Sequence, residues 1–430
     1  MGGGRSEMPE EKRERPEGET AESFLASFLP ELLRLLAKYE AIELEDVELH
    51  AGKLTLELLP FVPAVAPPKP PVAAPVKPTE LLEATFEEPV MTYPGKVVEV
   101  RIGATRSEGG SRGRTYIIGG ETNPPFYIFE HPPPHKPIIS MDVFEYDLLK
   151  AKKLGMPKAV KMHVKDVIHD PGEWARRNVE KFGADMVVVH LLSMDPLIEG
   201  RAPREALKTV EEVLQAVDVP VVVGGCGDPE VDAAAFKLAS DMFSGERLIM
   251  SSLTLDMAEK GVLEETAKAV AEHGHIALAF TPIDLNLARE LNRKLYGHVD
   301  RESIIMDLTS AALGYGSEYS YTIMERARLA ALMGDKELQH PIMACSANTW
   351  AAREAWLKEA EMGEIWGPRE LRGPMYETVC ALVYLLAGAD WLMVEHPATA
   401  RTLREVIDML MERGRAKPEA IADWASKHLG

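Results

Sequence analysis

The sequence predicts an α/β fold, a (β/α)₈ TIM barrel preceded by an N-terminal α+β extension. From about residue 137 onward, eight short runs rich in β-branched residues alternate with helical patterns. This alternation is typical of parallel βα units, and the nearly continuous apolar character of the runs suits strands buried on both faces. A barrel of this kind needs about 250 residues. The 430 residues of the chain therefore leave room for an extension.

The residues before the barrel divide into four expected segments. Residues 1–20 are mostly Glu, Arg, Gly and Pro, and we expect a disordered tail. Residues 21–60 combine helical spacing with an alternating apolar pattern, which predicts a small helix–hairpin unit. Residues 61–79 are a Pro/Ala-rich linker. Residues 80–136 are expected to hold pre-barrel strands, paired around a Gly/Ser-rich turn and covering one end of the barrel.

The barrel itself is expected to span residues 137–430. KAVKMHV (158–164) competes with PIISMDV as the first strand, so the identity of strand one stays open at this point. Amphipathic patterns such as PREALKTVEEVLQAV predict helices between the strands. The strands that we assign are PIISMDV, DMVVVHL, PVVVGG, RLIMSS, HIALAF, SIIMDLT, PIMACS and WLMVEH.

Composition narrows the classes of function. The formal net charge of −20 argues against a nucleic-acid partner, which requires clustered Lys and Arg. No run approaches the roughly 20 uncharged apolar residues of a membrane span, and the N-terminus lacks a signal core, so we expect a cytoplasmic protein without a membrane partner. The three cysteines Cys226, Cys345 and Cys380 are too widely spaced for a CxxC metal or iron–sulfur site.

Candidate functional residues follow from the barrel prediction. In TIM barrels the functional groups lie at the C-terminal ends of the strands and in the loops that follow them. Polar residues end nearly every predicted strand. The candidates for binding a ligand at this barrel mouth are Asp142, His190, Gly225, Thr281, Asp307, Thr309, Asn348 and Glu395.

Structural roles compete with binding for several of these residues. Asp284, Thr309 and Asn348 each precede a helical run, so capping is as good an explanation as binding. His190 and His396 are more often satisfied by backbone groups than used as ligands. Cys226 lies between glycines but has no obvious histidine partner, and Cys345 and Cys380 read as core residues.

Other motifs are weaker. No GxGxxG follows a strand and opens a helix, so a dinucleotide fingerprint is absent. DVIHDPG resembles the Asp-x-His-x-x-Gly loop with which cobalamin modules present an axial histidine, but its spacing is Asp-x-x-His, so His169 is not expected to bind cobalt. Met324 and Met333 stand at positions that favour core packing.

Three long stretches carry a resemblance to a known family. TPIDLNLARELNRKLYG (281–297), SIIMDLTSAALGYGSEYSYTIMERARLAAL (303–332) and ELRGPMYETVCALVYLLAGADWLMVEHP (370–397) resemble the delta subunit of the acetyl-CoA decarbonylase/synthase complex, also called the corrinoid iron–sulfur protein small subunit. The resemblance extends from about Phe126 to the C-terminus. The N-terminal tail and the Pro-rich region resemble nothing of use.

The resemblance implies a pterin-binding-type barrel that pairs with a large (gamma) subunit. That partner would bring a [4Fe–4S] cluster and a cobalamin-binding domain, so the cobamide would be shared between the two chains. It would carry a methyl group between a tetrahydropterin, served by a pterin methyltransferase, and the acetyl-CoA synthase and CO dehydrogenase subunits. Strand-end groups could then hydrogen-bond the corrin side amides, with Asp307, Thr309, Asn348 and Thr281 preferred by position.

Whether the chain has a catalytic acid of its own stays open. Asp142, Asp307 and Asn348 could imitate the set with which a pterin methyltransferase holds its pterin and protonates N5. We expect instead an accessory subunit with no catalytic residue. A free-standing pterin-dependent methyltransferase and a purely structural scaffold are the alternatives.

Overall fold

The computed structural model of the chain describes residues 91–126, 132–148 and 156–412. The expected tail, helix–hairpin unit and linker (residues 1–20, 21–60 and 61–79) lie outside these residues. The domain boundaries given above therefore stay predictions.

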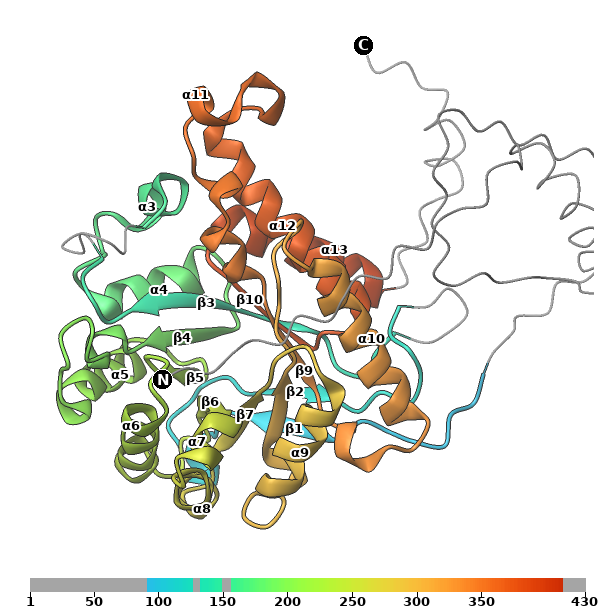
Figure 1. Ribbon diagram of the computed structural model, residues 1–430. Helices are drawn as coiled ribbons and strands as arrows, with labels where there is room; N and C mark the ends of the chain where they lie inside the picture. The colour runs from blue at the N-terminus through green and yellow to red at the C-terminus, as the bar shows by residue number, and fades with distance from the viewer. Residues whose placement is uncertain (1–90, 127–131, 149–155, 413–430) are drawn as a thin grey trace, which may run out of the picture. The chain divides into compact units, whose positions relative to one another are not determined.

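Eight parallel strands close into a barrel in the order β10-β3-β4-β5-β6-β7-β8-β9. Each strand coincides with one of the eight runs assigned from the sequence, so the fold class is confirmed (Figure 1). The strands are β3 (Ile138–Phe144), β4 (Met186–His190), β5 (Val221–Gly224), β6 (Ile249–Thr254), β7 (Ile276–Phe280), β8 (Ile304–Asp307), β9 (Ile342–Cys345) and β10 (Trp391–Val394).

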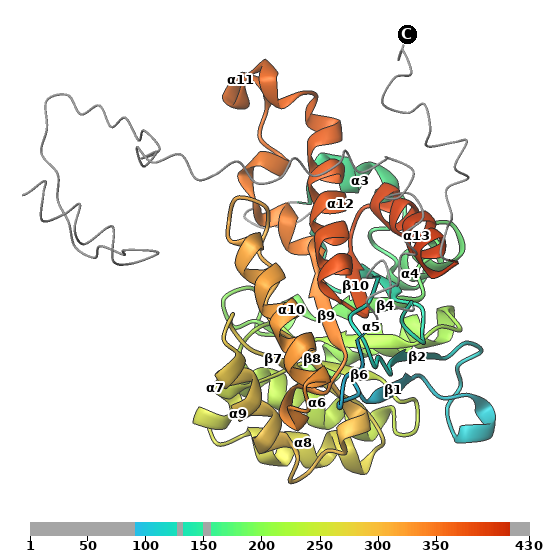
Figure 2. The same cartoon turned by 90° about the vertical axis from the view of Figure 1, so that its right-hand side faces the viewer.

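Helices surround the barrel (Figures 1 and 2). The amphipathic pattern PREALKTVEEVLQAV (203–217), quoted above as an example, forms α5. The described α-helices are α3 (Lys158–Val164), α4 (Pro171–Glu180), α5 (Pro203–Ala216), α6 (Pro229–Met242), α7 (Leu255–Glu259), α8 (Leu263–Glu272), α9 (Leu285–Leu295), α10 (Ser317–Leu332), α11 (Glu359–Met362), α12 (Arg369–Ala387) and α13 (Pro397–Met411).

The structure decides the first strand. PIISMDV forms β3, which pairs with β10 and β4, whereas KAVKMHV forms helix α3. Val160, Met162 and Val164 alternate with other residues, as in a strand, but the buried residues of α3 are Ala159, Val160 and Val164, while Met162 is 64% exposed. The buried residues are separated by one and four positions, a spacing that places them on one face of a short helix and not on one face of a strand.

A β-hairpin closes the N-terminal end of the barrel. Strands β1 (Glu99–Ile102) and β2 (Tyr116–Gly119) pair antiparallel, as the sequence pattern predicts. Val100, Ile102 and Ile118 are fully or almost fully buried, and they pack in one cluster with the apolar residues of the barrel interior. This hairpin is therefore an apolar plug beneath the barrel.

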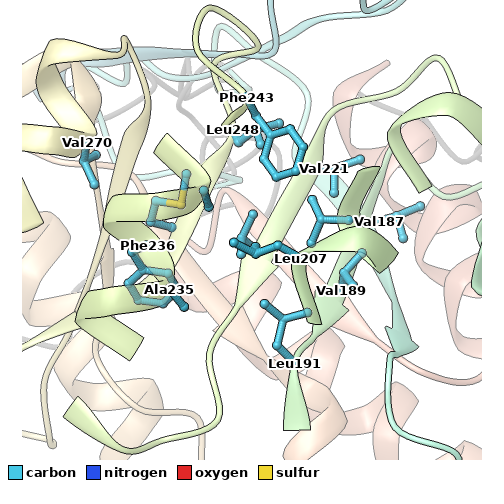
Figure 3. Packing of buried hydrophobic residues seen from close by; sticks show 14 of the residues in the cluster. Val187, Val189, Leu191, Leu207, Val221, Ala235, Phe236, Phe243, Leu248 and Val270 are labelled. Carbon is cyan, nitrogen blue, oxygen red and sulfur yellow. The ribbon is translucent and has the colours of Figure 1, made fainter. Parts of the chain in front are cut away.

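Alternate residues of each strand face the barrel interior, as the two-residue period of a strand requires. Met186 and Val188 of β4, for example, belong to the interior cluster, whereas Val187 and Val189 belong to the layer between strands and helices. Figure 3 shows Leu207 of α5 beside Val187, Val189 and Val221 in that outer layer. The set of alternate residues that faces inward thus decides which side chains at the C-terminal end of each strand reach the barrel mouth.

A buried ion cluster ties the hairpin to the barrel. Arg328 of α10 lies 3.1 Å from Glu121, which follows β2, and 2.6 Å from Asp390, which precedes β10. The Asp390 carboxylate also accepts a hydrogen bond from the backbone N–H of Ile342, at the start of β9. The three charged side chains are almost completely buried. They lock the N-terminal ends of β9 and β10 in place.

Candidate functional site

The uppermost interior layer of the barrel is polar. The apolar side chains that point into the barrel include Ile138, Met186, Ile305, Met343 and Trp391. Every second residue after each of these also points inward, and counting in this way gives the last inward-facing residue of each strand. The lower interior positions of these strands are apolar except for Ser140 of β3, whereas the last ones carry ionisable groups. These last positions are Asp142, His190, Asp307, Cys345 and Glu395.

Asp307 lies at the end of β8 and is almost completely buried. Burial raises the pKa of its carboxyl to about 7, and the hydrogen bond that Oδ1 accepts from the backbone N–H of Thr309 opposes this shift only in part. In the described part of the chain Asp307 makes no ion pair. A carboxyl of this kind is available in both protonation states near neutral pH.

The loop after β8 is held in an uncommon conformation. Thr309 has φ +70°, in the left-handed region that a β-branched residue rarely adopts. Its Oγ1 donates to the carbonyl oxygen of Thr281, 2.9 Å away, and its N–H donates to Asp307. Thr309 thus ties the ends of β7 and β8 together, and its backbone strain marks the site as a functional candidate.

Two further acids meet at the ends of β10 and β3, and β9 separates β10 from β8. Val394 of β10 pairs with Met141 of β3, so Glu395 and Asp142 are neighbours at the next position. Burial raises the pKa of the Glu395 carboxyl well above its ordinary value, and the negative charges of Asp142 and Glu377 raise it further. Burial and the neighbouring negative charges thus favour the protonated form of Glu395.

Asp142 also approaches a histidine. Its Oδ1 lies 3.2 Å from Nε2 of His190, whose ring stacks on Phe144 with the centroids 5.0 Å apart. A Cβ at Gly224 would come within 3.0 Å of the His190 ring, so glycine there leaves the ring its space. Even so, the contact between Asp142 and His190 lacks the geometry of a hydrogen bond.

Five buried polar atoms around the mouth have no hydrogen-bond partner in the structure. They come from the ends of β3, β4, β7, β9 and β10. Buried polar groups in proteins are nearly always hydrogen-bonded, so such a gathering calls for a ligand or ordered water. The atoms are Asp142 Oδ1, His190 Nε2, Thr281 Oγ1, Ser346 Oγ and Glu395 Oε2.

Cys345 and Ser310 complete the mouth. Burial raises the pKa of the Cys345 thiol well above its usual value, and Asp142 and Asp307 add to the effect, so the sulfur stays protonated. The Ser310 hydroxyl accepts a hydrogen bond from the Cys345 backbone N–H at 2.9 Å. Cys345 is buried, as expected of a core residue, but it also lies beside the acids.

Two of the sequence candidates take structural contacts. Asn348 is exposed, and its amide donates to the carbonyl oxygen of Ser310 at 3.0 Å. A Cβ at Gly225 would lie 2.3 Å from the Asp232 carboxylate, which accepts hydrogen bonds from the N–H groups of Cys226 and Gly227. Glycine at 225 thus lets a helix residue close the loop after β5.

Glu377 and Trp350 support the mouth from outside, and the sequence reading did not find them. Glu377 of α12 is fully buried, and its carboxylate accepts hydrogen bonds from the backbone N–H groups of Glu395 and His396 and from Nε1 of Trp350. Burial raises the pKa of Glu377 to about 7. An acidic residue inside an otherwise apolar helix segment was the available signal.

The remaining interpretations have mixed outcomes. Asp284 caps α9, accepting from the N–H groups of Asn286 and Leu287. Nδ1 of His396 accepts from the N–H of Ala398, and burial lowers its pKa to about 4, so this histidine is a neutral cap. The core prediction is right for Met324, which is buried, and wrong for Met333, which is 67% exposed because it ends α10.

The loop cysteine and the loop histidine do not reach the mouth acids. Burial raises the pKa of the Cys226 thiol to about 12, which suits an unreactive thiol. Nδ1 of His169 lies 3.2 Å from a carboxylate oxygen of Asp147. Among residues 91–126, 132–148 and 156–412 there is no group of three His, Cys, Asp or Glu side chains arranged to hold a metal ion. No helix of these same residues is long and apolar enough to cross a membrane.

Comparison with known proteins decides the family. The family "CO dehydrogenase/acetyl-CoA synthase delta subunit" matches residues 99–361. The chain belongs to this delta-subunit family. The match begins before Phe126, so the resemblance reaches further toward the N-terminus than the sequence stretches indicated.

Relatives within the delta-subunit family are similar over most of the chain. The acetyl-CoA decarbonylase/synthase complex subunit delta of Archaeoglobus fulgidus is 44% identical, covering 82% of this chain and 77% of its own. Subunit delta 2 of Methanosarcina acetivorans is 40% identical, covering 92% of this chain and 89% of its own. Among solved structures, dihydropteroate synthase from Xanthomonas albilineans is 16% identical with a TM-score of 0.42, covering 64% of this chain and 93% of its own.

Proposed function

We propose that the barrel mouth of this delta-subunit family member holds the exposed side of a cobamide brought by a large (gamma) subunit. In this proposal the cobamide carries a methyl group between a tetrahydropterin and the acetyl-CoA synthase/decarbonylase, and the [4Fe–4S] cluster belongs to the partner. The chain is then an accessory subunit of the complex. The observation that carries the proposal is the ring of five unpartnered buried polar atoms at the mouth.

The donor set fits a corrinoid. The periphery of a corrin ring bears side amides, each of which both donates and accepts hydrogen bonds. Glu395 and Asp307, whose pKa values are raised by burial, can both donate from the protonated acid and accept, as an amide partner requires. Thr281 and Ser346 add hydroxyls with the same double capacity.

The chain's own residues would orient and shield the ligand. Bound at the mouth, the cobamide would supply the cobalt that accepts and releases the methyl group. Beneath the polar layer, the apolar interior up to Met393 excludes water from below. Because Asp307 is buried and makes no ion pair with the described residues, its carboxyl can keep a proton near neutral pH. We assign no catalytic residue.

Co-expression with the candidate large subunit tests partner, cofactor and class together. We expect a complex of defined stoichiometry whose visible spectrum contains corrin absorption. Corrin retained as tightly by the partner alone as by the complex would favour a purely structural scaffold. Tetrahydropterin binding to the purified chain in calorimetry would favour a free-standing pterin-dependent methyltransferase.

A matched pair of variants tests the mouth directly. Thr281→Val removes a buried hydroxyl that has no hydrogen-bond partner among the described residues, whereas Thr266→Val removes an equally buried hydroxyl that donates to the carbonyl oxygen of Val262, just before α8. One hydrogen bond contributes about 1 kcal/mol, so Thr281→Val should weaken corrin retention about fivefold. Thr266→Val should leave retention unchanged. Equal retention in both variants would contradict the proposal.

Asp307→Ala tests whether Asp307 takes part in methyl transfer or serves only to bind the corrin. If the chain lacks a catalytic acid, a heterodimer with this change that still contains corrin should transfer the methyl group at the normal rate in a single turnover. Loss of transfer, with corrin and partner still bound, would assign Asp307 a catalytic role instead.

A further inference from the structure

A second candidate binding site lies outside the ring of mouth residues. It is a groove of about 780 Å³ between α3 and the segment from Trp350 to Arg369. Its size is within the range of small-molecule sites, which is about 300–1,000 Å³. The described residues that line it are Met156, Pro157, Lys158, Lys161, Met162, Lys165, Trp350, Trp356 and Arg369.

The groove is cationic in a strongly acidic protein. Four of its described lining residues are Lys or Arg and none is a carboxylate, although the whole chain has a net charge of −20. Lys158 lies 3.5 Å from Glu370 at the groove's edge. In the described part of the chain, Lys161 and Lys165 have no carboxylate within ion-pairing distance. Two neighbouring lysines that lack a carboxylate partner among the described residues, in a groove of an acidic protein, indicate an anionic ligand.

The groove also offers aromatic and thioether surfaces. Trp356 is 38% exposed, and Met162 is 64% exposed. Trp350 is fixed by the hydrogen bond from its Nε1 to Glu377, and Ala159 and Val160 of α3 pack against it. An indole face next to cationic groups suits a ligand that joins a flat ring to an anion.

We propose that this groove binds a nucleoside phosphate, with the phosphates at Lys161 and Lys165 and the base against Trp356. Such a ligand is either a free nucleotide or the nucleotide tail of a larger cofactor. The proposal does not depend on what occupies the barrel mouth, because none of the five unpartnered mouth atoms belongs to a residue that lines the groove.

The first test measures binding of ADP to the full chain by calorimetry at low salt. We expect saturable binding that weakens as salt is added. Adenosine and inorganic pyrophosphate each lack one half of the ligand and should bind at least about tenfold more weakly. No saturation by ADP at millimolar concentration, or tighter binding of polyglutamate than of ADP, would overturn the proposal.

Matched variants locate the site. Lys161→Gln combined with Lys165→Gln should weaken ADP binding about tenfold, since each exposed charge contact contributes up to about 1 kcal/mol. Lys208→Gln together with Lys268→Gln is the control, because both lysines lie on helices away from the groove. Equal losses in the two pairs would mean unspecific charge attraction and would overturn the proposal.

A tryptophan pair tests the ring contact in the same way. Trp356→Ala should weaken binding about tenfold, because base stacking on an aromatic side chain contributes about 1–3 kcal/mol. Trp366, which is 47% exposed and does not line the groove, provides the control Trp366→Ala. An unchanged affinity in Trp356→Ala would overturn the assignment.

Competition distinguishes the two sources of the ligand. Displacement of ADP by cobalamin but not by cobinamide, which lacks the nucleotide, would assign the groove to the tail of a corrinoid. Absence of displacement by either would assign it to a free nucleotide. Both results support recognition of a nucleoside phosphate.

Discussion

The two ends of the barrel differ in how completely their polar groups are satisfied. At the N-terminal end, the β1–β2 hairpin supplies an apolar plug, and Arg328 pairs with two buried carboxylates. At the C-terminal end, Asp307 and Glu395 are buried without a cation among the described residues, and five polar atoms there have no hydrogen-bond partner. The first end is built for stability. The second retains unsatisfied groups that a ligand can satisfy, which is how binding sites reduce the stability of a fold.

The largest expected effect is at the stable end. Arg328→Ala leaves Glu121 and Asp390 buried without their cation, so the free energy of unfolding should fall by about 3–5 kcal/mol. Arg114→Ala is the control, because Arg114 pairs with Asp218 while both side chains are about half exposed. That change should cost less than about 1 kcal/mol. Denaturant unfolding followed by circular dichroism measures both, and similar losses would remove the contrast between buried and exposed pairs.

Replacing the buried acid Asp307 at the barrel mouth should raise the free energy of unfolding at pH 8, in contrast to the loss expected for Arg328→Ala. The pKa of Asp307 is about 7 in the folded protein, against about 3.9 in an unfolded chain, so the folded state binds more protons between these values. Its contribution to the free energy of unfolding therefore falls as pH rises from about 4 to about 7, by up to about 4 kcal/mol.

Asp307→Asn tests this sign. Asparagine keeps an acceptor for the Thr309 N–H and cannot ionise, so the variant should be more stable than the wild type at pH 8 and equal to it near pH 4. Unfolding curves at several pH values, compared as differences between the two proteins, cancel the other titrating groups. A variant less stable than the wild type at pH 8 would show that the carboxylate is well solvated.

The smallest expected change in the free energy of unfolding concerns the β1–β2 hairpin. Ile102→Val removes one methylene from a fully buried position and should cost about 0.5–1.5 kcal/mol. Ile117→Val is the control on the partner strand, where the side chain is 38% exposed, and the change there should be negligible. Equal costs would mean that the hairpin does not form part of the core.

The barrel was predictable because its signals are local. Eight apolar runs with intervening helical patterns specify eight βα units, and each run became a strand. The choice between β3 and α3 for the first strand was not predictable from KAVKMHV, because Met162 fits the alternation of a strand and is exposed only through the way α3 packs on Trp350 and Ala355. Tertiary packing overrode the local pattern there.

The site was predictable only in part. The rule for TIM barrels led to Asp142, His190, Asp307 and Glu395, but it could not say which strand-end residues point inward. That depends on the parity of each strand, which the apolar runs do not reveal because both faces are buried. The hydrogen bonds from Trp350 and the backbone of Glu395 to Glu377 join distant parts of the chain and leave no local pattern.

The closure of the barrel has a consequence for synthesis of the chain. Ile138 of β3 pairs with Trp391 of β10, and Nε1 of Trp391 donates to the Ser140 hydroxyl at 2.7 Å. Until β10 has left the ribosome, β3 and β9 are unpaired edges, and such edges invite association with other chains. Contacts between such distant residues also slow folding. A growing chain that stops before Trp391 would expose two adhesive edges, so complete translation is itself a safeguard against aggregation.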